Sequence, residues 1–213
     1  MTNHAFSQPA PGKSSARILW LLTFFCVFVW SAIDPKEYFT WALEVLPAVI
    51  GAMVLALTYR RFPLTRLTYT LILFHCVILM VGGHYTYAEV PLFDWIQSAF
   101  DLERNNYDKL GHFAQGFVPA VIAREILVRH SVVNGKRWLV LIVLSICLAV
   151  SAFYELIEWA VALASGESAE AFLGTQGDVW DTQSDMALAL VGAISSLALL
   201  SGAHDRQMEK LSG

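Results

Sequence analysis

Residues 138–164, WLVLIVLSICLAVSAFYELIEWAVALA, decide the fold of this chain. The run is almost wholly apolar, and it exceeds the roughly 20 residues that a helix needs to cross a hydrocarbon core of ~30 Å. Its two acids, Glu155 and Glu158, come near its end and lie three residues apart, so they share one face of a helix. The stretch therefore predicts a membrane-spanning helix with a polar end.

Similar apolar runs recur along the chain, which is 56% hydrophobic and only 15% charged over its 213 residues. We expect spans near residues 18–33, 39–59, 67–83, 108–128, 138–164 and 181–200. Ten-residue stretches of alternating hydrophobicity, which mark outer-membrane barrels, are absent from the sequence. The predicted fold class is all-α: a polytopic membrane protein with six transmembrane helices in one bundle.

The remaining segments predict the domain organisation. We expect a disordered cytoplasmic tail over residues 1–16, a transmembrane domain over 17–203 and a cytoplasmic tail over 204–213. The first span could mimic a signal peptide, but a poor cleavage site and the spans that follow favour a retained helix. Residues 89–104 are too short and too charged to cross, so they predict an interfacial helix or loop. The three cysteines each lie within an apolar run, which favours small buried hydrophobes over disulfides.

Basic residues predict the orientation, because cytoplasmic loops carry an excess of Lys and Arg. With the six spans above, only Lys36, Arg104 and Lys109 fall on one side. The other side holds Lys13, Arg17, Arg60, Arg61, Arg66, Arg124, Arg129, Lys136, Arg137, Arg206 and Lys210. We therefore expect an inner-membrane protein with both termini in the cytoplasm.

Acids and a histidine gather at the opposite ends of three spans. Asp108 and His112 open the fourth span four residues apart, and Asp181 and Asp185 have the same spacing at the start of the sixth. An ionisable group in the hydrocarbon costs at least ~2.5–3.5 kcal/mol on insertion scales, so such groups face a cavity or a partner. Together with the acids that end residues 138–164, these side chains predict one polar site at the periplasmic face.

Two interpretations of this site stay open. Carboxylates with an imidazole suit a divalent cation, although no H-E-x-x-H zinc signature is present. The predicted metal ligands are Asp108, His112, Glu155, Glu158, Asp181 and Asp185. Alternatively the groups are internal structural contacts, with Asp108 paired to Lys109 or Arg104 and His112 bonded to Glu155 or a backbone carbonyl.

The leading functional hypothesis is metal-assisted action on, or binding of, a membrane lipid or envelope precursor. The predicted catalytic residues are His112, Glu155, Glu158 and Lys109, with His112 as ligand or general base and Lys109 offering charge to a phosphate. The alternatives are a proton-coupled transporter and a non-catalytic membrane partner protein. No G-x-S-x-G elbow is present, and no feature suggests nucleic-acid binding.

Five further polar residues carry weaker predictions. His84 belongs either to the site or to the interfacial aromatic belt, and His75 is expected to be a hydrogen-bonded core histidine. Glu44 predicts an interior acid paired across helices. Arg124 and Glu125 are expected at the cytoplasmic interface.

The chain resembles the YjdF family of bacterial inner-membrane proteins over nearly all six spans. The resemblance rests on GHYTY at residues 83–87, YDKLGHF at 107–113, YELIEW at 154–159 and GDVWDTQSDM at 177–186. It implies membership and an inner-membrane location, and it brings no reaction with it.

The C-terminal half is also distantly similar to VanZ, a membrane protein associated with glycopeptide resistance. The Asp-Lys-x-x-His pattern of that family is matched by Asp108, Lys109 and His112. Its Glu-x-x-Gln pattern meets Glu155, with Glu158 in place of Gln. Its Asp-x-x-x-Asn-x-x-Gly pattern meets Asp185 and Gly192, with Ala189 in place of Asn.

Overall fold

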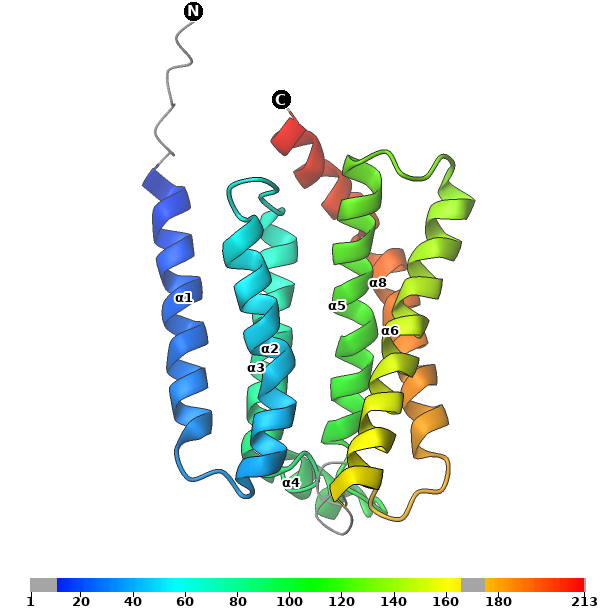
Figure 1. The fold of residues 1–213 in the computed structure, drawn as a ribbon. Coiled ribbons are helices and arrows are strands. Elements are labelled where there is room, and N and C mark those ends of the chain that lie inside the picture. Colours follow the sequence, from blue (N-terminus) through cyan, green and yellow to red (C-terminus); the bar gives the residue numbers. More distant parts are fainter. Residues whose placement is uncertain (1–10, 166–174, 213) are drawn as a thin grey trace, which may run out of the picture.

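The computed structural model describes residues 11–165 and 175–212, and the regular secondary structure of that part of the chain is all helical. Its helices are α1 (Pro11–Ala32), α2 (Tyr38–Thr58), α3 (Arg66–Tyr85), α4 (Pro91–Phe100), α5 (Tyr107–Arg129), α6 (Lys136–Ser165) and α8 (Asp181–Ser212). The long helices stand side by side, and the short α4 lies across one end of the bundle (Figure 1). The start of α1 and the end of α8 lie at the other end. The all-helical prediction is confirmed.

Five helices are long and apolar enough to cross a membrane: Ser15–Ala32, Tyr38–Thr58, Arg66–Tyr85, Lys136–Ala164 and Asp181–Leu211. The segment predicted as the fourth span, α5, is not among them, because charged and polar residues interrupt it. This helix stands between α3 and the pair α6 and α8, and it packs on all three (Figure 1). Its central place explains its polarity, since neighbouring helices shield its side chains from the surroundings.

Both ends of the chain are more helical than predicted. The first helix begins at Pro11, inside the segment expected to be a tail, while residues 1–10 lie outside the described part. The last helix continues past the expected end at residue 200 to Ser212. The extension follows from burial, because His204 and Met208 on its inner side are almost fully covered.

Side chains from neighbouring segments fix several helix ends. The carboxylate of Glu37 caps α2 by accepting from the backbone N–H groups of Phe39 and Thr40. Burial raises the pKa of Glu37, but these two donors outweigh it and hold the pKa below its usual value. The hydroxyl of Thr65 caps α3 by accepting from the N–H of Thr68.

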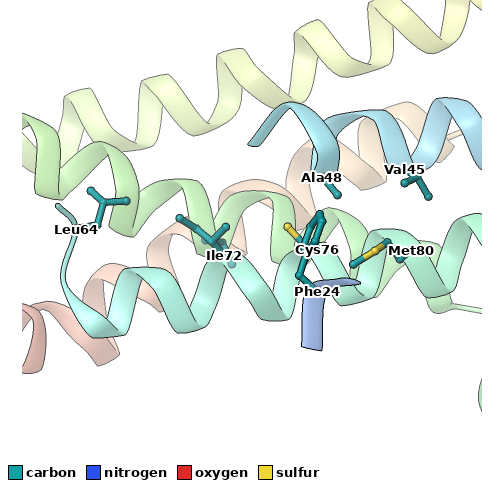
Figure 2. Close-up of a cluster of buried hydrophobic side chains, with 8 residues drawn as sticks. Phe24, Val45, Ala48, Leu64, Ile72, Cys76 and Met80 are labelled. Atoms are coloured by element: carbon teal, nitrogen blue, oxygen red, sulfur yellow. The ribbon is translucent and has the colours of Figure 1, made fainter. Parts of the chain in front are cut away.

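An apolar core joins the first three helices to α5. Phe24 of α1, Val45 of α2 and Met80 of α3 belong to one buried cluster, which Val118 extends to α5 (Figure 2). Cys76 lies in this cluster, and Cys147 is buried in a second core. Both fit the prediction of small buried hydrophobes, whereas Cys26 is exposed on α1; all three thiols are free.

The closest helix contact joins α5 to α8. A Cβ atom added to Gly116 of α5 would lie 1.7 Å from the carbonyl oxygen of Ala189. One added to Gly192 of α8 would lie 2.1 Å from the carbonyl oxygen of Phe113. The backbones touch directly, as small residues allow in membrane bundles. This contact fixes the relative position of the two helices that carry His112 and Asp185.

Candidate functional site

The starts of α5 and α8 and the final part of α6 meet at the α4 end of the bundle. His112 lies at the centre of this meeting point. Its Nε2 atom is 3.3 Å from Asp108 Oδ1 and 3.7 Å from Asp185 Oδ2, and its Nδ1 atom is 3.7 Å from Glu155 Oε1. All four side chains are buried. The predicted convergence of three separate helices on one polar cluster is therefore observed for these residues.

The two ring nitrogens of His112 face different partners. Nδ1 lies 3.2 Å from Gln115 Oε1, an amide oxygen that can accept a hydrogen bond from Nδ1–H. In the neutral tautomer that carries its proton on Nδ1, Nε2 presents its lone pair to the carboxylates of Asp108 and Asp185. Three acceptors facing one another repel unless a cation, either a proton or a metal ion, lies between them. One ligand atom from each of these residues lies within 4.8 Å of the others.

Two carboxylate oxygens of the cluster are buried without a hydrogen-bond partner in the described part of the chain. They are Glu155 Oε1 and Asp185 Oδ1. Buried polar atoms in native proteins nearly always have a partner, so each such atom requires an explanation. Both belong to residues next to the ring of His112, Glu155 on its Nδ1 side and Asp185 on its Nε2 side.

Arg104 supplies the cluster with a positive charge from the chain itself. Its guanidinium pairs with Asp181 and lies 3.3 Å from Asp108 Oδ2 and 3.6 Å from Asp178 Oδ2. The sequence left two partners open for Asp108, Lys109 and Arg104. The structure pairs it with Arg104, which lies four residues before it. The pair with Asp181 links the connection before α5 to the start of α8, and no sequence spacing indicates it.

The acid cluster extends to α2 through Glu44. The hydroxyl of Tyr154 on α6 donates to Glu44 Oε2 at 3.3 Å, so the expected cross-helix contact of this acid is confirmed. Glu158 is buried on the same side of α6 and lies close enough to interact electrostatically with Glu155, His112 and Glu44. Six buried carboxylates therefore surround one arginine and one histidine: Glu44, Asp108, Glu155, Glu158, Asp181 and Asp185.

Lys109 and His84 stay outside the cluster. Lys109 is half-buried, and no hydrogen bond or ion pair joins it to another residue among those described. His84, near the end of α3, faces α1: its Nδ1 is 3.1 Å from the carbonyl oxygen of Ser31, and its ring lies against Trp30. The role predicted for Lys109 has no geometric support from the cluster.

The connections around α4 cover the cluster. The amide of Gln176 pairs with the backbone of Asn105 in both directions, at 3.0 and 2.9 Å. Arg104 donates to the carbonyl oxygen of Thr175 at 3.2 Å. Residues 166–174, in the connection before α8, lie outside the described part, and the contacts of Arg104 and Asn105 with Thr175 and Gln176 join the described connections over the cluster.

A second polar cluster lies near the other end of α5. Glu125 is fully buried, and its carboxylate accepts from the Thr65 N–H, the Thr68 hydroxyl and Arg129. His204 of α8 lies 3.0 Å from the same carboxylate. Arg124 is also buried. Both residues are covered because α8 extends past residue 200, and their expected position at the cytoplasmic interface stays a prediction. Every oxygen of Glu125 has partners, so this cluster is a structural link between α3, α5 and α8.

The comparisons with known proteins agree with this architecture. A family model described as "Predicted membrane protein (DUF2238)" matches residues 16–206. The chain belongs to this family. It is also 51% identical over 189 residues to "Inner membrane protein YjdF" of Escherichia coli (strain K12), a match that covers 89% of this chain and 90% of that protein. No solved structure matches. The chain is therefore an integral membrane protein of the YjdF family, and the similarity to VanZ has no support in these comparisons.

Proposed function

We propose that this YjdF-family protein binds a divalent cation at the Asp108–His112–Asp185 cluster and uses it to bind, or act on, a lipid or lipid-linked envelope precursor. The observation that carries the proposal is the position of His112, whose Nε2 lies 3.3 Å from Asp108 Oδ1 and 3.7 Å from Asp185 Oδ2 while its Nδ1 lies 3.2 Å from Gln115 Oε1. Metal-binding histidines commonly have this arrangement, in which one nitrogen donates to an oxygen and the other binds the ion.

The same proposal places the protein in the inner membrane with six spans and both termini in the cytoplasm. Three observations support it: α5 runs the full length of the bundle, the start of α1 and the end of α8 share one end, and most basic residues fall at that end (Figure 1). The cluster is then periplasmic. A reporter fused at Ser98 should report a periplasmic location and one at Asn134 a cytoplasmic location; the reverse pattern would overturn this orientation.

Charge also supports a bound cation. When ionised, the six buried carboxylates exceed the positive charge that Arg104 and His112 can provide, and uncompensated buried charge costs several kcal/mol per ion. Oxygen-rich sets favour Mg²⁺, Mn²⁺ or Ca²⁺, and a single imidazole is compatible with Mn²⁺ or Zn²⁺. A bound divalent ion would polarise a carbonyl or phosphoryl oxygen of the substrate.

The geometry also assigns roles to the residues around the ion. Asp108, His112 and Asp185 would hold it, and Arg104 orients Asp108 from behind through its ion pair. Both nitrogens of His112 are then engaged, so the general-base role passes from His112 to Glu155. Its Oε1 atom is buried beside the ring and has no hydrogen-bond partner in the described structure.

The transporter alternative is less well supported by the packing. The direct backbone contacts of Gly116 with Ala189 and of Gly192 with Phe113 lie immediately inward of His112 and Asp185. They leave no room for water between α5 and α8 at this depth. A cluster at one end of the bundle, bounded by this direct packing, suits a binding or reaction site better than a path across the membrane.

Metal content of the purified protein tests the proposal. Protein prepared in detergent without chelator, and again after chelation and reloading with Mn²⁺, Zn²⁺ or Mg²⁺, would be measured by elemental mass spectrometry. We expect close to one ion per chain in the wild type and loss of that ion in Asp185→Asn and His112→Gln.

The matched control is Asp178→Asn, which removes a carboxylate at the same end but outside the ligand set. It should retain the ion. Wild-type protein that neither carries nor takes up any of these metals would refute the proposal, and the cluster would then hold protons. Equal loss in the Asp178 variant would show that binding depends on bulk negative charge.

A further inference from the structure

The short helix α4 has two different faces. Toward the bundle, the ring of Phe93 packs edge-on against Tyr107 at 5.2 Å, and Asp94 Oδ1 accepts from the side chain of Asn105 at 2.7 Å. Away from the bundle, Leu92 and Trp95 are 62% and 65% exposed. Ala99 is exposed on the same side, because residues 92, 95 and 99 follow helical spacing. The outer face of α4 is therefore apolar and uncovered.

The position of α4 identifies what covers this face. It lies between the end of α3 and the start of α5, across the end of the bundle, and thus at the level where membrane helices leave the hydrocarbon (Figure 1). Trp159 and Trp180 are exposed near the same end, on α6 and just before α8. Tryptophan concentrates at the boundary of headgroups and acyl chains. Exposed tryptophans at this end of the bundle are therefore consistent with α4 lying at that boundary.

Charge narrows the choice of lipid. The sequence of α4, PLFDWIQSAF, contains no Lys or Arg, so electrostatic attraction to anionic headgroups does not contribute. Its single acid, Asp94, is turned inward and bonded to Asn105. Burial of apolar surface alone drives the contact, and this suits a leaflet of zwitterionic lipid.

We infer that α4 is an interfacial helix whose Leu92, Trp95 and Ala99 face inserts into the headgroup and acyl boundary of the leaflet opposite the termini. The insertion also has a consequence for the buried cluster. Asp94 binds Asn105, and Asn105 pairs with Gln176, so the cover over the acids is tied to a helix held by lipid. The inference does not depend on whether a metal binds.

Spin-label accessibility tests the inference on the full chain in phosphatidylcholine nanodiscs. In a Cys26→Ala background, where the two buried cysteines remain, labels would be placed by Leu92→Cys, Trp95→Cys and Ala99→Cys. The control is Glu103→Cys, an exposed acid in the connection just after α4. All four sites are at the surface, so the substitutions leave the packed interior intact.

We expect the labels at 92, 95 and 99 to collide more with oxygen, which dissolves in lipid, than with a water-soluble nickel complex. The label at 103 should show the reverse. Nickel accessibility at all four sites would place the face in water and overturn the inference. Immobile labels with low access to both reagents would also overturn it, because a second protein copy would then cover the face.

Discussion

The backbone contact between α5 and α8 makes a sharp prediction about Gly116. A methyl group at this position would lie 1.7 Å from the carbonyl oxygen of Ala189, whereas non-bonded heavy atoms settle near about 3.5 Å. Because the neighbour is backbone, no side chain can rotate away. The two helices would have to separate by about 2 Å, or α5 would have to turn.

Overpacking of a well-packed interior costs about 1–3 kcal/mol, and a clash with backbone belongs at the upper end of that range. For a chain of this length, 1 kcal/mol shifts the melting temperature by about 2–4 °C. We therefore expect Gly116→Ala to lower the melting temperature in detergent by about 5–10 °C. Intrinsic fluorescence or a thermal-shift assay would measure it.

Gly51 provides the matched control. It lies within α2, and a Cβ atom added there meets nothing within 4 Å. Alanine is the better helix former by about 0.5–1 kcal/mol, so Gly51→Ala should be neutral or slightly stabilising. Gly192→Ala, whose Cβ atom would lie 2.1 Å from the Phe113 carbonyl oxygen, should resemble Gly116→Ala.

The same substitution should damage the cluster. Asp185 lies one turn before Ala189, and His112 lies one turn before Gly116, so separation of the helices moves the two side chains apart. Metal retention should therefore fall in Gly116→Ala but not in Gly51→Ala. If Gly116→Ala were as stable as Gly51→Ala, the helices would not be in backbone contact and the reasoning from their packing would be refuted.

Three further predictions concern single charged side chains. Arg104→Gln leaves two buried aspartates without their positively charged partner, so it should lower the free energy of unfolding by about 3 kcal/mol. Lys109→Gln removes the same charge and should leave the melting temperature nearly unchanged. Glu125→Gln weakens the hydrogen-bond network around a buried carboxylate, so it should lower the free energy of unfolding by about 2–3 kcal/mol. A loss below about 1 kcal/mol would contradict the structural role of the Glu125 cluster. Glu37→Gln should lower stability by about 0.5–1 kcal/mol at pH 7. The pKa of Glu37 is depressed in the folded chain, so its contribution is complete above its ordinary pKa and is lost as the pH falls through the folded value; melting temperatures of the two proteins should converge there.

Helical spacing was enough to predict much of the cluster. Asp108 and His112 had to share a face, and charged groups at membrane depth had to turn inward, so their meeting with Glu155 and Asp185 followed. Helical spacing did not decide whether Arg104 or Lys109 pairs with Asp108. Both are basic and near Asp108 in sequence, and only the path of the connection before α5 brings Arg104 over two aspartates.

The end of the bundle that holds Glu125 and His204 was harder to predict. Glu125 follows an arginine near the end of a span, a pattern that suits an interfacial position. Its burial depends on α8, which continues past residue 200 and places His204 against it. No strong stop signal marks the end of that helix in the sequence. The extension could be found only from the packing that stabilises it.

The polarity of α5 connects these observations. This helix fails a simple test of apolar composition, yet it carries the central residues of both polar clusters, His112 near one end and Glu125 near the other. A helix facing lipid could not carry them, because each buried charge would lack a partner. A central helix can, provided that its neighbours supply counter-charges. Around Glu125 they do so completely. Around His112, two carboxylate oxygens have no hydrogen-bond partner among the described residues, and this difference separates a structural cluster from a candidate site.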